Sequence, residues 1–232
     1  MDEDVLIVIP TLNEAENLVE LLEGIRAHVP GASVLIVDDG SPDGTAALAR
    51  ELGTRLGHID VLERPRPLGL GSAYVEGFRR GLARGYRRLV SMDADLSHEP
   101  RYLHGVSVVN WSLYRLAMSL GANVYARRVT GLPVRDCTSG FQCIRREVLE
   151  SLDVSTLRFS GYSFLIDLKY RAYRLGFRLA EVPIVFTDRK FGFSKITQGE
   201  IWRSVWAVWA IRLGGTRQRR RAPGTLAPPP AG

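Results

Sequence analysis

The chain has 232 residues, of which 45% are hydrophobic and 24% charged, a composition typical of one folded domain with a sizeable core. Its 31 Lys and Arg residues against 25 Asp and Glu give a formal charge of +6, much of it from four arginines within residues 217–221. The folded part is therefore nearer neutral, and no nucleic-acid partner is expected. No apolar run approaches the roughly 20 residues that cross a bilayer, so any membrane contact is expected from one side.

Apolar runs and amphipathic segments alternate along the first 92 residues. Strands are expected at 5–9, 34–37, 59–62 and 89–92, and helices after residue 13, at 45–56 and at 72–84. Asn13 and Glu16 have the spacing of a capping box for the first helix. Strands that alternate with helices in this way predict right-handed βαβ crossovers and a parallel α/β sheet, in which ligands bind beyond the carboxyl ends of the strands.

Polar motifs follow three of these strands. They are PTLNE at 10–14, DDGSPDGT at 38–45 and DAD at 93–95. Because Asp93 and Asp95 are two positions apart in an extended segment, both carboxylates can reach one hard cation, and a metal-bound diphosphate fits such a site. Alone, D-x-D also suits a surface turn, and DDGSPDGT suits a turn with a helix cap. Three such motifs at neighbouring strand ends favour a single site, where Asp39 is placed to bind a ribose or a base.

The N-terminus and the cysteines indicate the cellular compartment in which the protein is expected. The acidic start MDEDV leads directly into an apolar strand, so no signal peptide is expected. Cys137 and Cys143 have neither C-x-x-C nor metal-ligand spacing, which is typical of a reducing cytoplasm. Residues 1–213 are expected to form one domain and the Gly, Pro and Arg-rich residues 214–232 a disordered tail.

A helix expected at 200–213 carries three tryptophans on one side, Trp202, Trp206 and Trp209. Tryptophan beside arginine suits the headgroup layer of a membrane. A helix packed on its own domain shows the same stripe, so both interpretations stay open at this point.

The motifs together resemble a known family. PTLNE, DDGSPDGT, R-x-x-G-L-G-x-A, MDADLSH, RY, TSGF, GYSF and DRKFGFSK occur in the order found in family 2 glycosyltransferases of the dolichol-phosphate or polyprenol-phosphate mannose synthase type, over about residues 4–213. The resemblance implies a GT-A fold, which is a Rossmann-like, mostly parallel sheet flanked by helices. It also implies inverting, metal-dependent transfer of mannose from GDP-mannose to a polyprenyl (dolichyl) monophosphate.

Carried over position by position, the resemblance implies three sets of residues. The donor would be held by Pro10, Leu12, Glu14, Val37, Asp39, Met92, Asp93 and Ala94. Mg²⁺ or Mn²⁺ would be bound by Asp93, Asp95 and Ser97. The catalytic set would be Asp95, Arg101, Arg115, Arg189 and Lys195, the last four meeting phosphates, although Arg115 equally suits a solvated surface charge. This inventory agrees with the chemistry, because a lipid monophosphate is already an anionic nucleophile and the step needs help for the leaving group rather than a strong base.

The chain departs from the family pattern on the acceptor side. Gln142 and Leu165 stand where the family usually has arginine and glutamine, whereas Asp167 keeps a carboxylate there. In addition, about 20 residues, enough for one helix and one strand of the sheet, are expected to be absent after His98. Either the sequence omits residues that the natural protein has, or the chain is truly shortened, and a shortened chain is expected to aggregate and to have little activity.

Two other functions stay open. One is a polyprenyl-phosphate transferase with another sugar nucleotide such as UDP-glucose, since the shared motifs hold diphosphate and metal rather than the hexose. The other is a noncatalytic nucleotide-sugar-binding module. The resemblance also implies a cytoplasmic protein peripherally associated with the cytoplasmic face of the membrane, with a membrane-anchoring protein as a further candidate partner.

Overall fold

The structure, a computed structural model, describes residues 3–96, 107–109, 113–157, 161–182, 185–187 and 198–214. Its main sheet has the strand order β3-β2-β1-β4-β6. These strands are β1 (Val5–Thr11), β2 (Ser33–Asp38), β3 (Ile59–Glu63), β4 (Arg88–Ser91) and β6 (Gln142–Arg145). The first four are parallel, and β6 runs antiparallel to β4. The expected α/β class and the mostly parallel sheet are confirmed, and the expected strands differ from the observed ones only by a residue or two at their ends.

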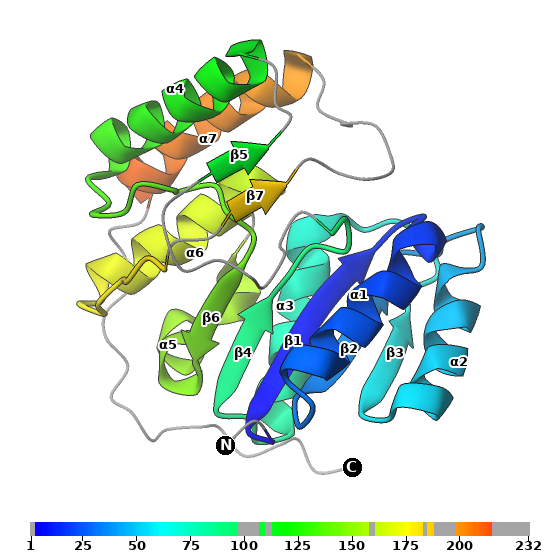
Figure 1. Ribbon diagram of the computed structural model, residues 1–232. Coiled ribbons are helices and arrows are strands. Elements are labelled where there is room, and N and C mark those ends of the chain that lie inside the picture. The colour runs from blue at the N-terminus through cyan, green and yellow to red at the C-terminus, as the bar shows by residue number, and fades with distance from the viewer. Residues whose placement is uncertain are drawn as a thin grey trace.

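Helices cover both faces of this sheet, as Figure 1 shows. The helices α1 (Ala15–His28) and α2 (Thr45–Leu56) pack on one face, and α3 (Leu70–Ala83) and α5 (Arg146–Leu152) on the other. Alternate residues of each strand enter the two layers, so Ile7 packs with α1 whereas Leu6 packs with α3. The close approach of α3 depends on glycine, because a Cβ on Gly77 would lie 2.2 Å from Cγ1 of Val8.

The strand β4 is paired on both sides, with β1 and with β6. Within the described sheet there is thus no vacant inner position beside β4, although a helix and strand are expected to be absent after residue 98. The chain next forms β5 (Ser107–Val109), which pairs in parallel with β7 (Val185–Thr187) in a separate two-stranded sheet.

In the second half of the chain, three helices pack against one another. They are α4 (Leu113–Thr130), α6 (Tyr162–Arg174) and α7 (Gln198–Gly214), and the short helix η1 (Val154–Thr156) precedes α6. Figure 1 shows α4 and α7 side by side. The Tyr125 hydroxyl of α4 donates to the carbonyl of Val205 in α7 at 2.9 Å, which links the two helices.

The helix α7 faces its own domain with aliphatic side chains. Val208 and Ile211 are 2% and 1% exposed, whereas Trp206 and Trp209 are 72% and 46% exposed. The interpretation in which the tryptophan stripe packs on the domain is therefore wrong for these two residues. The side chain of Trp202 lies outside the described residues, as does the expected tail beyond Gly214. No helix in the described ranges is both long enough and apolar enough to span a membrane.

Candidate functional site at the carboxyl ends of the strands

The first two motifs are joined by side-chain hydrogen bonds where β1 and β2 end. Asp38 is fully buried, and its carboxylate accepts hydrogen bonds from the Thr11 hydroxyl at 2.8 Å and from the Ser41 hydroxyl and backbone N–H at 2.6 and 2.9 Å. Thr11 and Asp38 are also register partners in the sheet. Asp38 therefore shapes the site and offers its carboxylate to the protein rather than to a ligand.

The start of α1 is capped by the second motif, so the expected capping box is wrong. Asn13 has a φ of 59°, and no cap hydrogen bond comes from the side chain at the N-cap, Glu14. Instead the N–H groups of Asn13, Glu14 and Ala15 donate to the side chains of Ser41, Thr45 and Asp43, at 2.9, 3.0 and 3.1 Å respectively. These bonds satisfy donors that a helix start leaves unpaired, and they hold PTLNE against DDGSPDGT.

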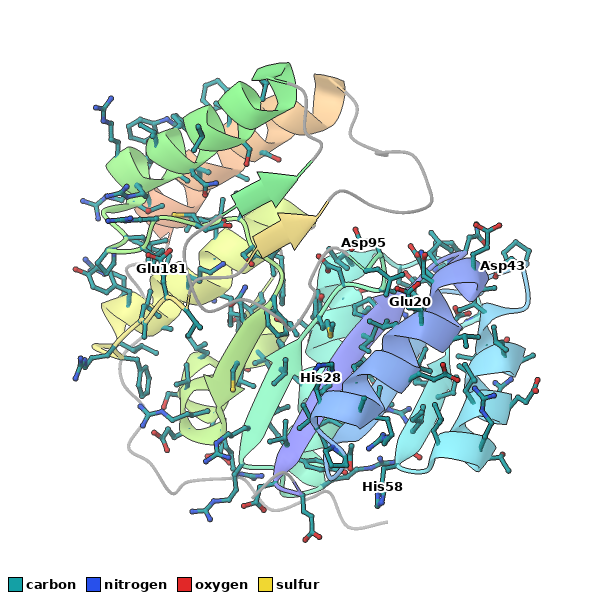
Figure 2. All side chains as sticks on the ribbon, viewed as in Figure 1. Glu20, His28, Asp43, His58, Asp95 and Glu181 are labelled. Atoms are coloured by element: carbon teal, nitrogen blue, oxygen red, sulfur yellow. The ribbon has the colours of Figure 1, made fainter. Side chains whose placement is uncertain are left out.

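Asp43 carries the charge in this junction. Partial burial opposes its ionisation, but hydrogen bonds from the Thr45 hydroxyl and from the N–H groups of Ala15 and Thr45 outweigh that effect and lower the pKa of Asp43. Figure 2 shows Asp43 and Asp95 at the same end of the sheet, whereas His28 and His58 lie away from it. No histidine in the described part of the chain is therefore placed to act as a base at this end.

Asp39 is part of a buried ion pair with Arg64, a residue that the sequence analysis missed. Asp39 and Arg64 are 6% and 7% exposed. The second carboxylate oxygen of Asp39 accepts the N–H groups of Leu68 and Gly69 at 3.2 and 3.1 Å, and Nη1 of Arg64 donates to the Ser72 hydroxyl at 2.7 Å. Asp39 thus fixes the glycine-containing segment before α3. The only sequence signal for Arg64 was a basic residue two positions after the strand expected at 59–62.

The DAD motif follows β4 and is largely buried. Met92 and Ala94 are buried in the core that β1 and β2 share with α1 and α2, and Asp95 is 8% exposed. Oδ1 of Asp93 accepts a hydrogen bond from the hydroxyl of Tyr74, on α3, at 2.9 Å. Burial raises the pKa of Tyr74 well above its usual value, and the charges of Asp93 and Asp95 raise it further. The hydroxyl therefore stays protonated and remains a donor.

The TSGF segment lies against the same carboxylate. A Cβ on Gly140 would lie 2.6 Å from Oδ2 of Asp93. The carbonyl of Gly140 accepts a hydrogen bond from the hydroxyl of Ser91, in β4, at 2.6 Å. On its other side the segment is bound by Nζ of Lys169, on α6, which donates to the carbonyls of Cys137 and Ser139 at 3.1 and 2.9 Å. The structure thus brings the fourth motif to the other three.

The expected donor residues lie at the ends of β1, β2 and β4. Val37 packs in the core beside α3, so it offers its backbone, and the same holds for Met92 and Ala94 beside α1. Pro10, Leu12 and Glu14 are partly exposed. Four of the expected site residues lie outside the described part of the chain, namely Ser97, Arg101, Arg189 and Lys195. The side chain of Arg115 also lies outside it.

Asp93 and Asp95 offer hard oxygen ligands, which suit Mg²⁺ or Mn²⁺. No group of three or more His, Cys, Asp or Glu side chains within metal-binding reach occurs among the described residues. A magnesium-like ion does not need one, because it keeps several waters and takes one or two carboxylates together with substrate phosphates. The two carboxylates therefore fit an ion that a diphosphate completes.

Among the residues expected on the acceptor side, Asp167 is 1% exposed, and its carboxylate accepts a hydrogen bond from Nε of Arg171 at 2.7 Å. Burial raises the pKa of Asp167, and the partner Arg171 opposes that shift. Gln142 donates from Nε2 to the carbonyl of Ser139 at 3.0 Å. Both side chains therefore contact the protein itself.

A cavity of about 590 Å³ lies between β3 and α3. Its lining includes Arg64, Ser72, Glu76 and Leu157, but neither aspartate of the DAD motif. A ligand in this cavity would contact Arg64 rather than the two carboxylates.

Comparison with known proteins agrees with this geometry. The family model described as Glycosyl transferase family 2 matches residues 6–107. A polyprenol monophosphomannose synthase of Mycolicibacterium smegmatis is 43% identical, over 89% of this chain and 87% of the relative. An undecaprenyl-phosphate mannosyltransferase of Micrococcus luteus is 38% identical, over 93% of this chain and 98% of the relative. The chain belongs to glycosyltransferase family 2 and is a glycosyltransferase, as the motifs indicated.

Solved structures show the same fold. The glucosyl-3-phosphoglycerate synthase of Mycobacterium tuberculosis, solved with Mn²⁺, UDP and glucosyl-3-phosphoglycerate, matches with a TM-score of 0.61 and 23% identity, over 91% of this chain and 79% of that one. The expected GT-A-like architecture is confirmed.

The two alignments also measure what this chain lacks. The alignment with the M. smegmatis protein has 230 positions, but 89% of 232 residues is about 206, so about 24 positions have no residue of this chain. The M. luteus alignment has 239 positions and 93% coverage, which leaves about 23. Both numbers match the size of the segment expected to be absent after His98.

Proposed function

We propose that this glycosyltransferase moves mannose from GDP-mannose to a polyprenyl monophosphate, with inversion at the anomeric carbon. The observation that carries the proposal is the identity of 43% and 38% with two relatives named for polyprenyl-phosphate mannose chemistry. The clustered motifs support it, because they bring polar side chains together at the strand ends. The choice of GDP-mannose over other donors comes from the resemblance of the motifs.

In this proposal the chain's own residues bind and orient the donor. Pro10, Leu12 and Glu14 hold the nucleotide at the end of β1, together with the end of β2. Asp93 and Asp95 hold Mg²⁺ or Mn²⁺ at the end of β4. When bound, the ion neutralises charge that develops on the departing diphosphate. The Mn²⁺ in the M. tuberculosis structure supports a divalent ion in this fold.

The basic residues complete the proposed phosphate contacts. Arg101, Arg115, Arg189 and Lys195 would bind phosphates of donor and acceptor, with Arg side chains suited to bidentate contacts. The acceptor phosphate is an anion at neutral pH, so it attacks without a strong general base. This agrees with the distance of His28 and His58 from the site in Figure 2.

The acceptor is a lipid, and we place its entry at the surface of α4 and α7. Exposed apolar side chains gather on these two adjacent helices: Met118, Leu120, Val124, Trp206, Trp209 and Leu213. Tryptophan beside arginines, here the exposed Arg212, is typical of helices that lie in the headgroup layer. The proposal is a peripheral protein on the cytoplasmic face of the membrane.

The test compares two sugar-nucleotide donors. The protein is incubated with a polyprenyl phosphate, Mn²⁺ and labelled GDP-mannose or UDP-glucose, and the label extracted into lipid is counted with and without EDTA. We expect metal-dependent transfer from GDP-mannose and an inverted anomeric proton signal by NMR. Transfer from UDP-glucose alone would replace the donor in this proposal. Tight GDP-mannose binding without any transfer would identify a noncatalytic module.

A further inference from the structure

The half-buried Asp93 carboxylate has a neighbour at each oxygen, and no motif-based assignment gives either neighbour a role. The Tyr74 hydroxyl donates to Oδ1 at 2.9 Å. Gly140 lies against Oδ2, since a Cβ there would be 2.6 Å away. The two residues come from α3 and from the segment before β6, which lie far apart in sequence.

We propose that Tyr74 and Gly140 form a two-sided socket that fixes the Asp93 carboxylate for metal binding, and that Lys169 is a positioning residue for the Gly140 side. This inference rests on the proposed function, because it assumes that Asp93 is a metal ligand. The outer partners of metal ligands commonly set ligand orientation and affinity in this way.

The Tyr74 side of the socket is rigid. Tyr74 is 0% exposed, and its ring stacks on Phe78 and on Phe164, with centroids 5.9 Å apart in each pair. A ring held between α3 and α6 cannot move its hydroxyl away from the carboxylate. A buried hydroxyl also costs free energy when it has no partner, so the bond to Asp93 is maintained from both ends.

The Gly140 side is rigid for a different reason. Its φ lies outside the left-handed region, so the backbone itself does not require glycine here. Its carbonyl is bound by Ser91, and Asp136 accepts the N–H groups of Thr138 and Ser139 at 2.9 and 2.8 Å. The backbone at Gly140 is therefore held in place, and an added methyl group would displace the Asp93 carboxylate.

Lys169 acts through this segment. Its ammonium donates to the carbonyls of Cys137 and Ser139, three residues and one residue before Gly140. Replacing it by methionine keeps an unbranched side chain that is one atom shorter and removes both hydrogen bonds. The Gly140 wall would then lose its contact with α6 while Asp93 itself stays untouched.

The test measures Mn²⁺ affinity in the presence of saturating GDP, by calorimetry and by the Mn²⁺ electron paramagnetic resonance signal. We expect the Mn²⁺ Kd to rise by about tenfold or more in Gly140→Ala and in Tyr74→Phe, the usual loss for an outer partner of a metal ligand. Lys169→Met should raise it less. The matched control is Gly24→Ala in α1, where an added Cβ has no atom within 4 Å, and its Kd should stay within twofold of wild type.

The melting temperature of each variant distinguishes a loss of carboxylate positioning from a loss of folding. If Tyr74→Phe, which keeps the ring stacking, leaves the Mn²⁺ Kd within twofold of wild type, the socket is overturned even where the melting temperature falls. This variant also decides the matter if Gly140→Ala does not fold. Wild-type protein that binds GDP but no Mn²⁺ would overturn the metal site of the proposed function, and the socket with it.

Discussion

Removing Arg64 should destabilise the protein far more than removing an exposed arginine from a similar pair. In Arg64→Met the buried Asp39 keeps the two backbone hydrogen bonds from Leu68 and Gly69 but loses its counter-charge. Breaking a buried ion pair from one side typically costs about 3–5 kcal/mol, because an uncompensated charge remains. The surviving hydrogen bonds place the expected loss in the free energy of unfolding near the lower end, about 3 kcal/mol.

The assay is urea unfolding followed by far-UV circular dichroism and tryptophan fluorescence, with Arg50→Met as the matched control. Arg50 pairs with Glu63 at the surface, where their side chains are 54% and 50% exposed. Exposed pairs contribute about 0–1 kcal/mol, so the control should change stability little. Equal losses in the two variants would refute the reasoning, since they would mean that burial of the Asp39–Arg64 pair has no consequence.

Three further outcomes are expected. Asp95→Asn should abolish transfer in a folded protein because it loses the charge that binds the metal, and turnover near the wild-type rate with metal present would contradict the metal site. The protein should sediment with anionic vesicles, and less of it should do so at high salt. The Trp206→Ser, Trp209→Ser double variant should sediment less than wild type. Undiminished vesicle binding by this variant would remove α7 from the proposed membrane surface. Burial lowers the pKa of Lys169 from 10.5 to about 8, so between these pH values the unfolded chain binds more protons and stability rises with pH. The free energy of unfolding of wild type, relative to Lys169→Met, should therefore increase across that window, and a flat difference would be inconsistent with the lowered pKa.

The sequence predicted the features that depend on local pattern. The buried strands and the helices of the first 92 residues follow from apolar periodicity and turn residues, and α2 has the bounds that were expected. The sequence also predicted that the DAD motif lies beside the other two motifs, because parallel strands bring their carboxyl ends to one edge of the sheet.

Features that depend on partners distant in sequence could not be predicted in this way. The α1 cap comes from side chains about 30 positions away, at Ser41, Asp43 and Thr45, and so a local capping box was the wrong interpretation. The sequence analysis assigned no role to Lys169, because the carbonyls that it binds, in and next to TSGF, lie about 30 positions away in the sequence. The exposure of Trp206 was equally undecidable, because amphipathic periodicity is the same for a buried and an exposed stripe.

The residues absent relative to both family members lead to the last prediction. The contacts that shape the proposed nucleotide site at the ends of β1 and β2 lie within residues 11–72 of the chain, and β4 has a neighbour on each side. We therefore expect the 232-residue chain to bind GDP-mannose, but to aggregate and to transfer slowly, since a lost helix uncovers apolar surface.

The measurement compares this chain with a variant in which the segment absent here, taken from one of the two relatives, is inserted after His98. Donor affinity should agree within a few-fold, whereas light scattering should fall and turnover should rise with the insertion. The intact mass of the natural protein decides between an omitted segment and a truly shortened chain. A monodisperse, fully active product of 25.8 kDa would show that the two-stranded sheet and the β4–β6 pairing replace the missing unit without loss.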